Sequence, residues 1–181
     1  MGIAVDRWLT ATVRQDADGL ADPEFVRGGT LASLSMRDTQ DAIYVAFRAA
    51  AGAKKVAVPE RLRFNVTSEI AVGRGLGSSA AAYVAGAALA NAMLKLGFDS
   101  FGIAEVGTAL EGHPDNVCPS VFGGATLALT HAGKVIVSPL EPPAPLLELP
   151  PQAARVSAMT PASATGRQPR CIELWDMLPP R

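Results

Sequence analysis

Three glycines within five positions, followed at once by two serines and an alanine run, constrain this chain more than any other feature. The segment is Gly73-Arg74-Gly75-Leu76-Gly77-Ser78-Ser79, and it leads into Ala80–Ala82. Glycine permits positive φ and close approach of the backbone to a ligand, while alanine is the strongest helix former. The segment therefore predicts a sharply turning loop that opens a helix near Ser78.

The start of such a helix is suited to binding an anion. Its first N–H groups have no partner within the helix, and the helix dipole places about half a positive charge there. Phosphate is the expected ligand. The spacing differs from a Walker A loop, which needs a lysine after the glycines, and from a dinucleotide-binding loop. A flexible glycine–serine connector is the alternative interpretation.

Composition and charge exclude several other classes of protein. The 181 residues suffice for one well-buried domain and a fragment of a second. A formal net charge of −1 indicates neither a nucleic-acid partner nor an anionic membrane. Cys118 and Cys171 give no disulfide framework or metal spacing, and no signal peptide is evident, so we expect a cytoplasmic protein. The apolar run Ala80–Leu96 is short for a membrane span and is expected to be a buried helix.

Hydrophobic periodicity predicts strands and helices that do not strictly alternate, which favours an α+β layered domain. The predicted strands are Trp8–Arg14, Phe25–Val26, Leu62–Ser68, and the hairpin of Ala125–Thr130 with Lys134–Ser138, joined by His131–Gly133. The predicted helices run from Asp38 or Thr39 to Gly52, from Ser78 to Gly97, and from Phe101 to Leu110 after a cap at Asp99 or Ser100. The last helix would deliver Glu111 at its C-terminal end.

The character of the chain changes at Pro139. Six prolines between Pro139 and Pro151 preclude a regular helix there. Beyond Thr160 the sequence shows neither an apolar period nor a core. Residues 160–181 are therefore the least folded-looking part of the chain.

Two motifs resemble those of a known family. The run Gly75–Ala81 resembles the second signature of the GHMP small-molecule kinases, and Glu111-Gly112-His113-Pro114-Asp115-Asn116-Val117, with Pro119 and Gly123-Gly124 after it, is similar to the homoserine kinase branch. The resemblance implies a GHMP-kinase N-terminal domain, which is a ribosomal-protein-like two-layer α/β sandwich, with a fragment of the C-terminal domain. It also implies ATP-dependent phosphorylation of L-homoserine to O-phospho-L-homoserine in threonine biosynthesis.

Phosphoryl transfer requires positioning and charge neutralisation more than covalent chemistry by the protein. The candidate ATP-binding residues are Gly73, Arg74, Gly75, Leu76, Gly77, Ser78 and Ser79. The Ser79 hydroxyl could ligate Mg²⁺, which prefers oxygen donors, with Glu111 as its carboxylate partner. The resemblance places the family's magnesium ligands on this pair, so both are candidate catalytic and metal-binding residues. The alternatives are that Ser78 or Ser79 only caps the helix, and that Glu111 is a solvated acid.

Three polar side chains follow Glu111 within a short loop. His113, Asp115 and Asn116 are held by Pro114, and such groups suit the ammonium and carboxylate of an amino acid. The resemblance places contacts with L-homoserine in this loop. Alternatively, Asp115 and Asn116 only build the turn. The resemblance implies no dedicated catalytic base, and Asp115 is a weak candidate for that role.

The chain also departs from the family. The first strand and the first signature, Pro-x-Ser-x-Asn-Leu-Gly-x-Gly-Phe-Asp, are missing, and Gly2–Asp6 resembles the part that follows them. Ala71 replaces the usual proline before the glycine loop, and the resemblance fades near Val156. The resemblance thus implies one ATP-binding domain over residues 1–156, followed by a divergent or disordered tail over residues 157–181. We therefore expect a chain truncated at both ends. Three functions stay open: a homoserine kinase (with a homodimer possible), a non-catalytic truncated remnant, and another GHMP kinase such as mevalonate kinase.

Overall fold

A computed structural model describes residues 1–16 and 23–141 and the backbone of residues 155–158. The strands are β1 (Gly2–Ile3), β2 (Leu9–Gln15), β3 (Glu24–Gly29), β4 (Leu62–Ser68), β5 (Ala125–His131), β6 (Lys134–Leu140) and β7 (Arg155–Ala158). The helices are α1 (Ala42–Ala53), α2 (Ser78–Leu94), α3 (Ser100–Glu111) and α4 (Val117–Phe122), with a 3₁₀ turn at Asp38–Gln40. Most of the predicted tail, residues 159–181, lies outside the described residues.

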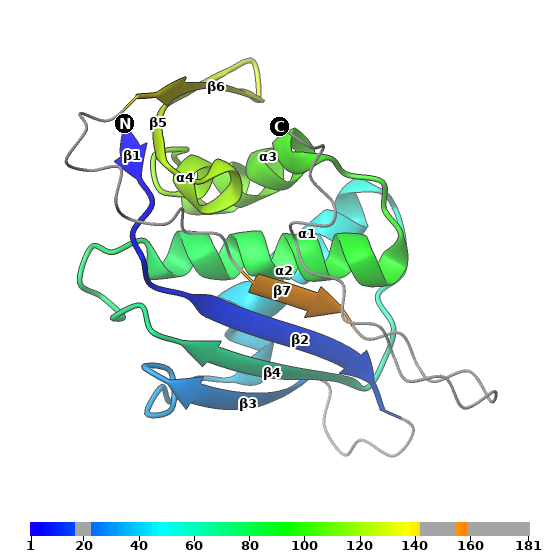
Figure 1. Ribbon diagram of the computed structural model, residues 1–181. Coiled ribbons are helices and arrows are strands. Elements are labelled where there is room, and N and C mark those ends of the chain that lie inside the picture. The colour runs from blue at the N-terminus through cyan, green and yellow to red at the C-terminus, as the bar shows by residue number, and fades with distance from the viewer. Residues whose placement is uncertain (17–22, 142–154, 159–181) are drawn as a thin grey trace.

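The strands form two sheets on opposite sides of the helices. The larger sheet has the order β3-β4-β2-β7, in which β4 and β2 are antiparallel while the two outer pairs are parallel. The smaller, antiparallel sheet has the order β1-β5-β6. Figure 1 shows α2 lying along the larger sheet, with α3 and α4 between α2 and the smaller sheet. The mixed pairing around packed helices confirms the predicted α+β layered class.

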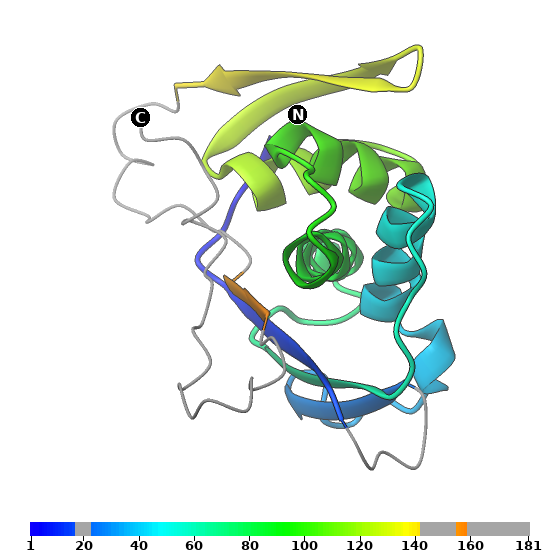
Figure 2. The ribbon, with the colours of Figure 1, turned by 90° about the vertical axis from the view of Figure 1, so that its right-hand side faces the viewer.

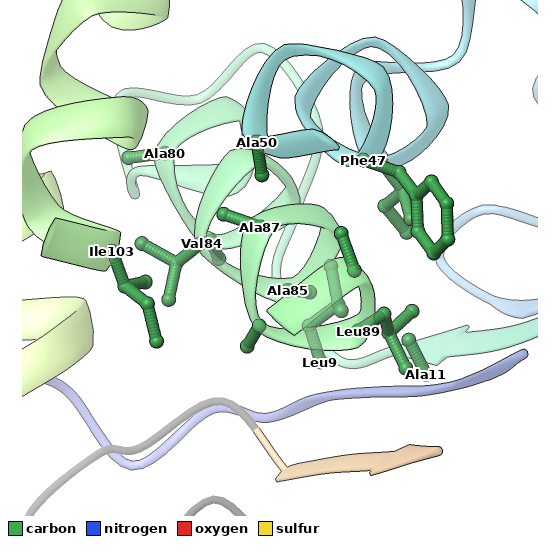
Figure 3. Packing of buried hydrophobic residues seen from close by; sticks show 14 of the residues in the cluster. Leu9, Ala11, Phe47, Ala50, Ala80, Val84, Ala85, Ala87, Leu89 and Ile103 are labelled. Atoms are coloured by element: carbon green, nitrogen blue, oxygen red, sulfur yellow. The ribbon is translucent and has the colours of Figure 1, made fainter. Parts of the chain in front are cut away.

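Helix α2 is the centre of the packing. Figure 2 views it end-on, with the larger sheet, α1 and α3 around it. Ten of its 17 residues are buried, and seven of these ten are glycine or alanine with little side chain to keep neighbours away (Ala80, Ala81, Ala85, Gly86, Ala87, Ala88 and Ala90). Figure 3 shows Val84 directed towards Ile103 of α3, and Leu89 beside Leu9 and Ala11 of β2. Among the described residues no helix is long and apolar enough to cross a membrane.

One glycine sets how closely α1 and α2 approach. A Cβ built on Gly86 would lie 2.0 Å from the carbonyl oxygen of Ile43 and 2.9 Å from the Cβ of Ala46. Contacts this short are not possible between real atoms, so a side chain at position 86 would push the two helices apart. The periodicity of the sequence did not single out this residue.

The helix boundaries differ from the predictions in two places. The segment Asp38–Gln40 forms a 3₁₀ turn and α1 begins at Ala42, because the Asp41 side chain accepts a hydrogen bond from Ile43 N and caps the helix there. Helix α2 ends at Leu94, before the predicted Gly97, because Lys95 adopts a left-handed conformation with φ of 52°. The predicted Asp99 cap is confirmed, since its side chain accepts from Gly102 N.

The smaller sheet also corrects the hairpin prediction. His131 belongs to β5 and pairs with Lys134, so the prediction that it lies in the turn was wrong. The turn is the two residues Ala132-Gly133, whose φ values of 48° and 76° are typical of a tight type I′ hairpin. Strand β6 extends through Pro139, which is tolerated because β6 lies at an edge of the sheet. Helix α4 was not predicted.

Candidate functional site

A pocket of about 490 Å³ lies where the glycine loop meets the C-terminal end of α3. Its polar lining comprises Ser78 and Ser79 at the start of α2, Glu111 at the end of α3, His113 and Asn116 in the loop after α3, and Asp41 just before α1. Its apolar lining includes Leu31, Leu34, Met36, Val72 and Leu76. The pocket therefore combines one polar region with a largely apolar wall.

The glycine loop turns sharply, as the sequence predicts. Gly73, Gly75 and Gly77 have φ values of 69°, 72° and 73°, a region that other residues rarely adopt. Gly77 occupies the N-cap position of α2 and has no side chain that could cap the helix. The alternative that Ser78 or Ser79 caps the helix is therefore wrong. The first amides of α2 are left without a side-chain cap beside the pocket.

Helices α2 and α3 meet through one hydrogen bond at the pocket. Ser79 Oγ donates to Glu111 Oε1 over 2.7 Å, although the two residues are 32 positions apart in the chain. Glu111 is the last residue of α3, because Gly112 follows it with φ of 91° and ends the helix. The predicted metal-binding pair is thus brought together within hydrogen-bond distance. Neither residue is buried, so both remain accessible to a ligand in the pocket.

The donor set of this pair suits one kind of metal ion. The described residues contain no group of three or more His, Cys, Asp or Glu side chains that could hold a metal. Mg²⁺ is commonly bound by one or two protein oxygens, with water and phosphate oxygens completing its octahedron. The Ser79 hydroxyl and the Glu111 carboxylate fit such a partial coordination.

The loop after α3 folds back against the glycine loop. His113 Nδ1 contacts Asp115 Oδ1, and the same carboxylate oxygen accepts from Asn116 N over 3.0 Å. A Cβ on Gly77 would lie 3.5 Å from the Cβ of Asn116, so the two loops are in close contact. His113 and Asn116 line the pocket, whereas neither Asp115 nor Arg74 is among its lining residues in the described part of the chain. Asp115 instead has the interactions of a turn-building residue.

The electrostatics of the pocket depend on the backbone rather than on cationic side chains. No Lys or Arg is among the described residues that line it. An anion here would therefore be attracted by the amides and dipole of α2. Behind the loop, burial raises the pKa of the Cys118 thiol to about 11, and the nearby Asp115 carboxylate adds to the shift. Cys118 is thus an inert, protonated packing residue.

One wall of the pocket was not predicted from the sequence. This wall comes from the segment between β3 and α1, with Leu31, Leu34 and Met36, and from Asp41 at the start of α1. The segment has no regular period, so its apolar residues gave no sign of which surface they face. Its only sequence signal is the three-residue spacing of Leu31 and Leu34, which is too short to predict an element.

Comparisons with known proteins agree on the family. The model of the GHMP kinases N-terminal domain matches residues 41–124. A homoserine kinase from Lactococcus lactis subsp. cremoris (strain SK11) is 35% identical over 135 residues, which cover 74% of this chain and 44% of that protein. One from Deinococcus radiodurans is 37% identical over 147 residues, covering 81% and 46%.

A solved structure is similar in fold. The homoserine kinase from Cytophaga hutchinsonii aligns with a TM-score of 0.53 at 22% identity, over 70% of this chain and 42% of that one. The chain thus spans less than half the length of the curated relatives and the solved structure described here.

Proposed function

This chain belongs to the GHMP kinase family, and from that premise we propose that it binds ATP and phosphorylates L-homoserine to O-phospho-L-homoserine, a step of threonine biosynthesis. The observation that carries the proposal is the 2.7 Å contact of Ser79 with Glu111 beside the uncapped start of α2. The choice of substrate is supported by relatives that are named homoserine kinases.

The pocket offers backbone amides to the phosphates of ATP and apolar side chains to its base. The phosphates would lie against the amides of Gly73–Ser79 and the first turn of α2, where the helix dipole favours negative charge. The adenine ring would lie against the apolar side chains of Leu31, Leu34, Met36, Val72 and Leu76. A volume of about 490 Å³ is within the range of small-molecule sites.

Ser79 and Glu111 would hold the magnesium ion that accompanies ATP. When bound, Mg²⁺ would neutralise part of the phosphate charge that builds up during transfer. The protein's own contribution is to fix this oxygen pair: α2 presents the hydroxyl from its first turn, and the end of α3 presents the carboxylate.

The loop after α3 is proposed to bind and orient L-homoserine. His113 and Asn116 line the pocket and would hydrogen-bond to the substrate, while Asp115 holds the imidazole of His113. In the reaction the substrate hydroxyl oxygen forms a bond to the γ-phosphorus, the bond to the ADP oxygen breaks, and the hydroxyl proton is released. We assign no catalytic base, because Asp115 does not line the pocket.

The proposal is tested by nucleotide binding and by turnover. Titration with a fluorescent ATP analogue measures binding, and a coupled assay of ADP release compares L-homoserine with mevalonate and galactose. We expect saturable binding and turnover with L-homoserine, of the order of 1–100 s⁻¹ that is usual for kinases. A preference for mevalonate or galactose would refute the substrate assignment, and no nucleotide binding would refute the whole proposal.

A second candidate is a non-catalytic remnant that retains nucleotide binding. The observation in its favour is that the chain spans 44–46% of the length of its curated relatives. Nucleotide binding without ADP release in the presence of L-homoserine would establish this candidate. For either function, the cytoplasm and a homodimer remain proposals.

A further inference from the structure

We infer that Arg27 is a positioning residue for the nucleotide, because it holds the pocket wall on which the adenine ring is proposed to lie. This inference rests on the proposed function. The wall is the segment Thr30–Asp41 between β3 and α1, which we call the strap. It contributes Leu31, Leu34 and Met36 to the pocket, whereas Arg27 itself does not line it.

The first end of the strap is fixed to β4. Thr30 N donates to Ser68 O over 2.8 Å, and Thr30 Oγ1 donates to Ile70 O over 2.7 Å. Ser68 ends β4, and the chain runs from there into the glycine loop. This end of the strap is therefore tied to the same backbone that leads into the proposed phosphate site.

Arg27 fixes the other end. Its Nε and Nη2 donate to Asp41 Oδ2 over 3.1 and 2.9 Å, and Nη2 also lies 2.8 Å from Asp38 Oδ1. The Asp41 side chain is at the same time the cap of α1, and Asp38 Oδ2 accepts from Phe25 N. One guanidinium thus joins β3, the 3₁₀ turn of the strap and the first turn of α1. The guanidinium carbon of Arg27 also lies 4.7 Å from the centre of the Phe25 ring.

This ion pair is largely shielded from solvent, so disturbing its geometry costs more than disturbing an ordinary surface pair. The side chains of Arg27 and Asp41 are 12% and 10% exposed, and charges attract more strongly where solvent screens them less. The planar guanidinium also presents several fixed N–H donors, which lysine cannot reproduce. Within the strap Leu31 packs against the core and Leu34 is half-buried, whereas Ala32, Ser33 and Ser35–Arg37 are exposed. The polar contacts at its two ends therefore contribute much of what holds the strap in place.

This arrangement predicts an effect on one end of the nucleotide. The strap supplies apolar contacts for the base, whereas the phosphates are proposed to bind at the amides of the glycine loop. Loosening the strap should thus weaken ATP binding but leave the binding of a phosphate chain without a base unchanged. A general loss of stability would weaken both.

Two variants and one matched control test the inference. Arg27→Lys keeps the positive charge but removes the planar guanidinium with its several N–H donors. Asp38→Asn removes one carboxylate charge and leaves the Arg27–Asp41 ion pair in place. The control is Arg63→Lys, because Arg63 on the neighbouring strand binds Glu24 through Nε and Nη2 at 2.9 and 2.7 Å without touching the strap. Affinity is measured with a fluorescent ATP analogue and by competition with inorganic tripolyphosphate. Hydrogen exchange of residues 30–41 is measured without ligand.

We expect Arg27→Lys and Asp38→Asn to weaken ATP binding about threefold to tenfold, with tripolyphosphate binding unchanged. Hydrogen exchange of the strap should become faster in Arg27→Lys, and Arg63→Lys should change none of these quantities. Unchanged ATP affinity in both variants, or equal weakening of tripolyphosphate binding, overturns the inference. If the unmodified protein binds no nucleotide, the proposed function fails; unaltered strap exchange in Arg27→Lys separately refutes the role of Arg27 in holding the wall.

Discussion

At the scale of single residues, the proposed magnesium site consists of a hydroxyl and a carboxylate that different helices bring together. We predict that Ser79→Ala and Glu111→Gln each lower kcat/KM for phosphoryl transfer by about 10²-fold or more. The first variant removes an oxygen ligand of the proposed Mg²⁺, and the second removes the negative charge of the other ligand. Either change would leave less positive charge to stabilise the phosphate charge that develops during transfer. The coupled ADP-release assay at saturating Mg²⁺ measures this. If the chain proves non-catalytic, the same variants should lose the Mg²⁺ dependence of nucleotide binding.

Two substitutions of the same residue types away from the pocket serve as controls. Glu105 also lies on α3, but its carboxylate pairs with Lys134, so Glu105→Gln should keep normal activity. Ser138 lies exposed on β6, and Ser138→Ala should likewise behave as the unmodified protein. Normal activity of Ser79→Ala or Glu111→Gln would contradict the magnesium assignment.

The buried thiol of Cys118 gives a second prediction at this scale. Since burial raises its pKa to about 11, the native thiol stays protonated and should not react with iodoacetamide at pH 8, whereas the protein in urea should react. A Cys171→Ser background leaves Cys118 as the single cysteine of the chain, which makes mass spectrometry of the product unambiguous. Fast alkylation of the native protein would show that α4 is not packed as described.

The raised pKa of Cys118 also predicts how the free energy of unfolding changes with pH. Below about pH 9 the thiol is neutral in both the folded and the unfolded state, so Cys118 causes no pH dependence. Between about pH 9 and 11 the unfolded thiol ionises first, and the free energy of unfolding falls. Cys118→Ala should therefore lose less stability than the parent over that interval, as urea titrations at several pH values would reveal.

Local patterns revealed some of these residues and concealed others. The resemblance to the GHMP kinases predicted Ser79 and Glu111 as a pair, and their side chains lie 2.7 Å apart. Arg27, Asp41 and Leu34 could not be predicted, because their roles arise from contacts between elements and from the path of an irregular segment. The uncapped start of α2 was also unforeseen, since serine at a helix start usually suggests a cap.

At the scale of elements, α1 and α2 approach each other closely where they cross at Gly86. We predict that Gly86→Ala lowers the free energy of unfolding by about 1–3 kcal/mol, because the added Cβ would collide with the Ile43 carbonyl and overpack the core. Urea denaturation measures the change. This cost should exceed the gain in helix propensity that alanine brings.

Gly52 near the end of α1 provides the matched control for this substitution. A Cβ there would meet nothing within 4 Å, so Gly52→Ala should be neutral or stabilising by about 0.5–1 kcal/mol. If both variants behaved alike, the crossing of α1 and α2 would have to be looser than described.

Elements with a strong period were predictable, and those fixed by tertiary contacts were not. Alternation gave β2 and β4, and the Asp99 cap gave the start of α3. The two-residue strand β1 has no periodicity to recognise, because it exists through its pairing with β5. The end of α2 was missed because Lys95, rather than a glycine, adopts the left-handed conformation that terminates it.

At the scale of the whole molecule, the smaller sheet packs one face on the helices and exposes the other. Figure 2 shows this sheet as the outermost layer above α3 and α4. Thr126 and Val135 on its inner side are 1% and 6% exposed. On the outer face, Leu127, Leu129 and Ile136 are each 52% exposed and Ile3 is 55% exposed. Alternation predicted the strands of the hairpin, but a strand sequence does not say whether its second face is covered.

This outer face should bind apolar probes and promote association of the protein. Grouped exposed apolar side chains have this property, whereas scattered ones do not. Leu129 and Ile136 are directly paired across β5 and β6, so the double change Leu129→Glu and Ile136→Lys replaces them with opposite charges that attract each other. We predict lower fluorescence of bound anilinonaphthalene sulfonate and less concentration-dependent association in sedimentation, with the free energy of unfolding changed by less than about 1 kcal/mol.

The control for this last variant is an exposed apolar residue that lies elsewhere. Val26 on β3 of the larger sheet is also 52% exposed, and it is the one large hydrophobic residue so exposed among the described residues of that sheet. Val26→Lys should therefore leave dye binding and association unchanged. If the paired substitution on the smaller sheet had as little effect as Val26→Lys, the grouping of the four side chains would have no physical consequence, and some other surface would have to account for any association.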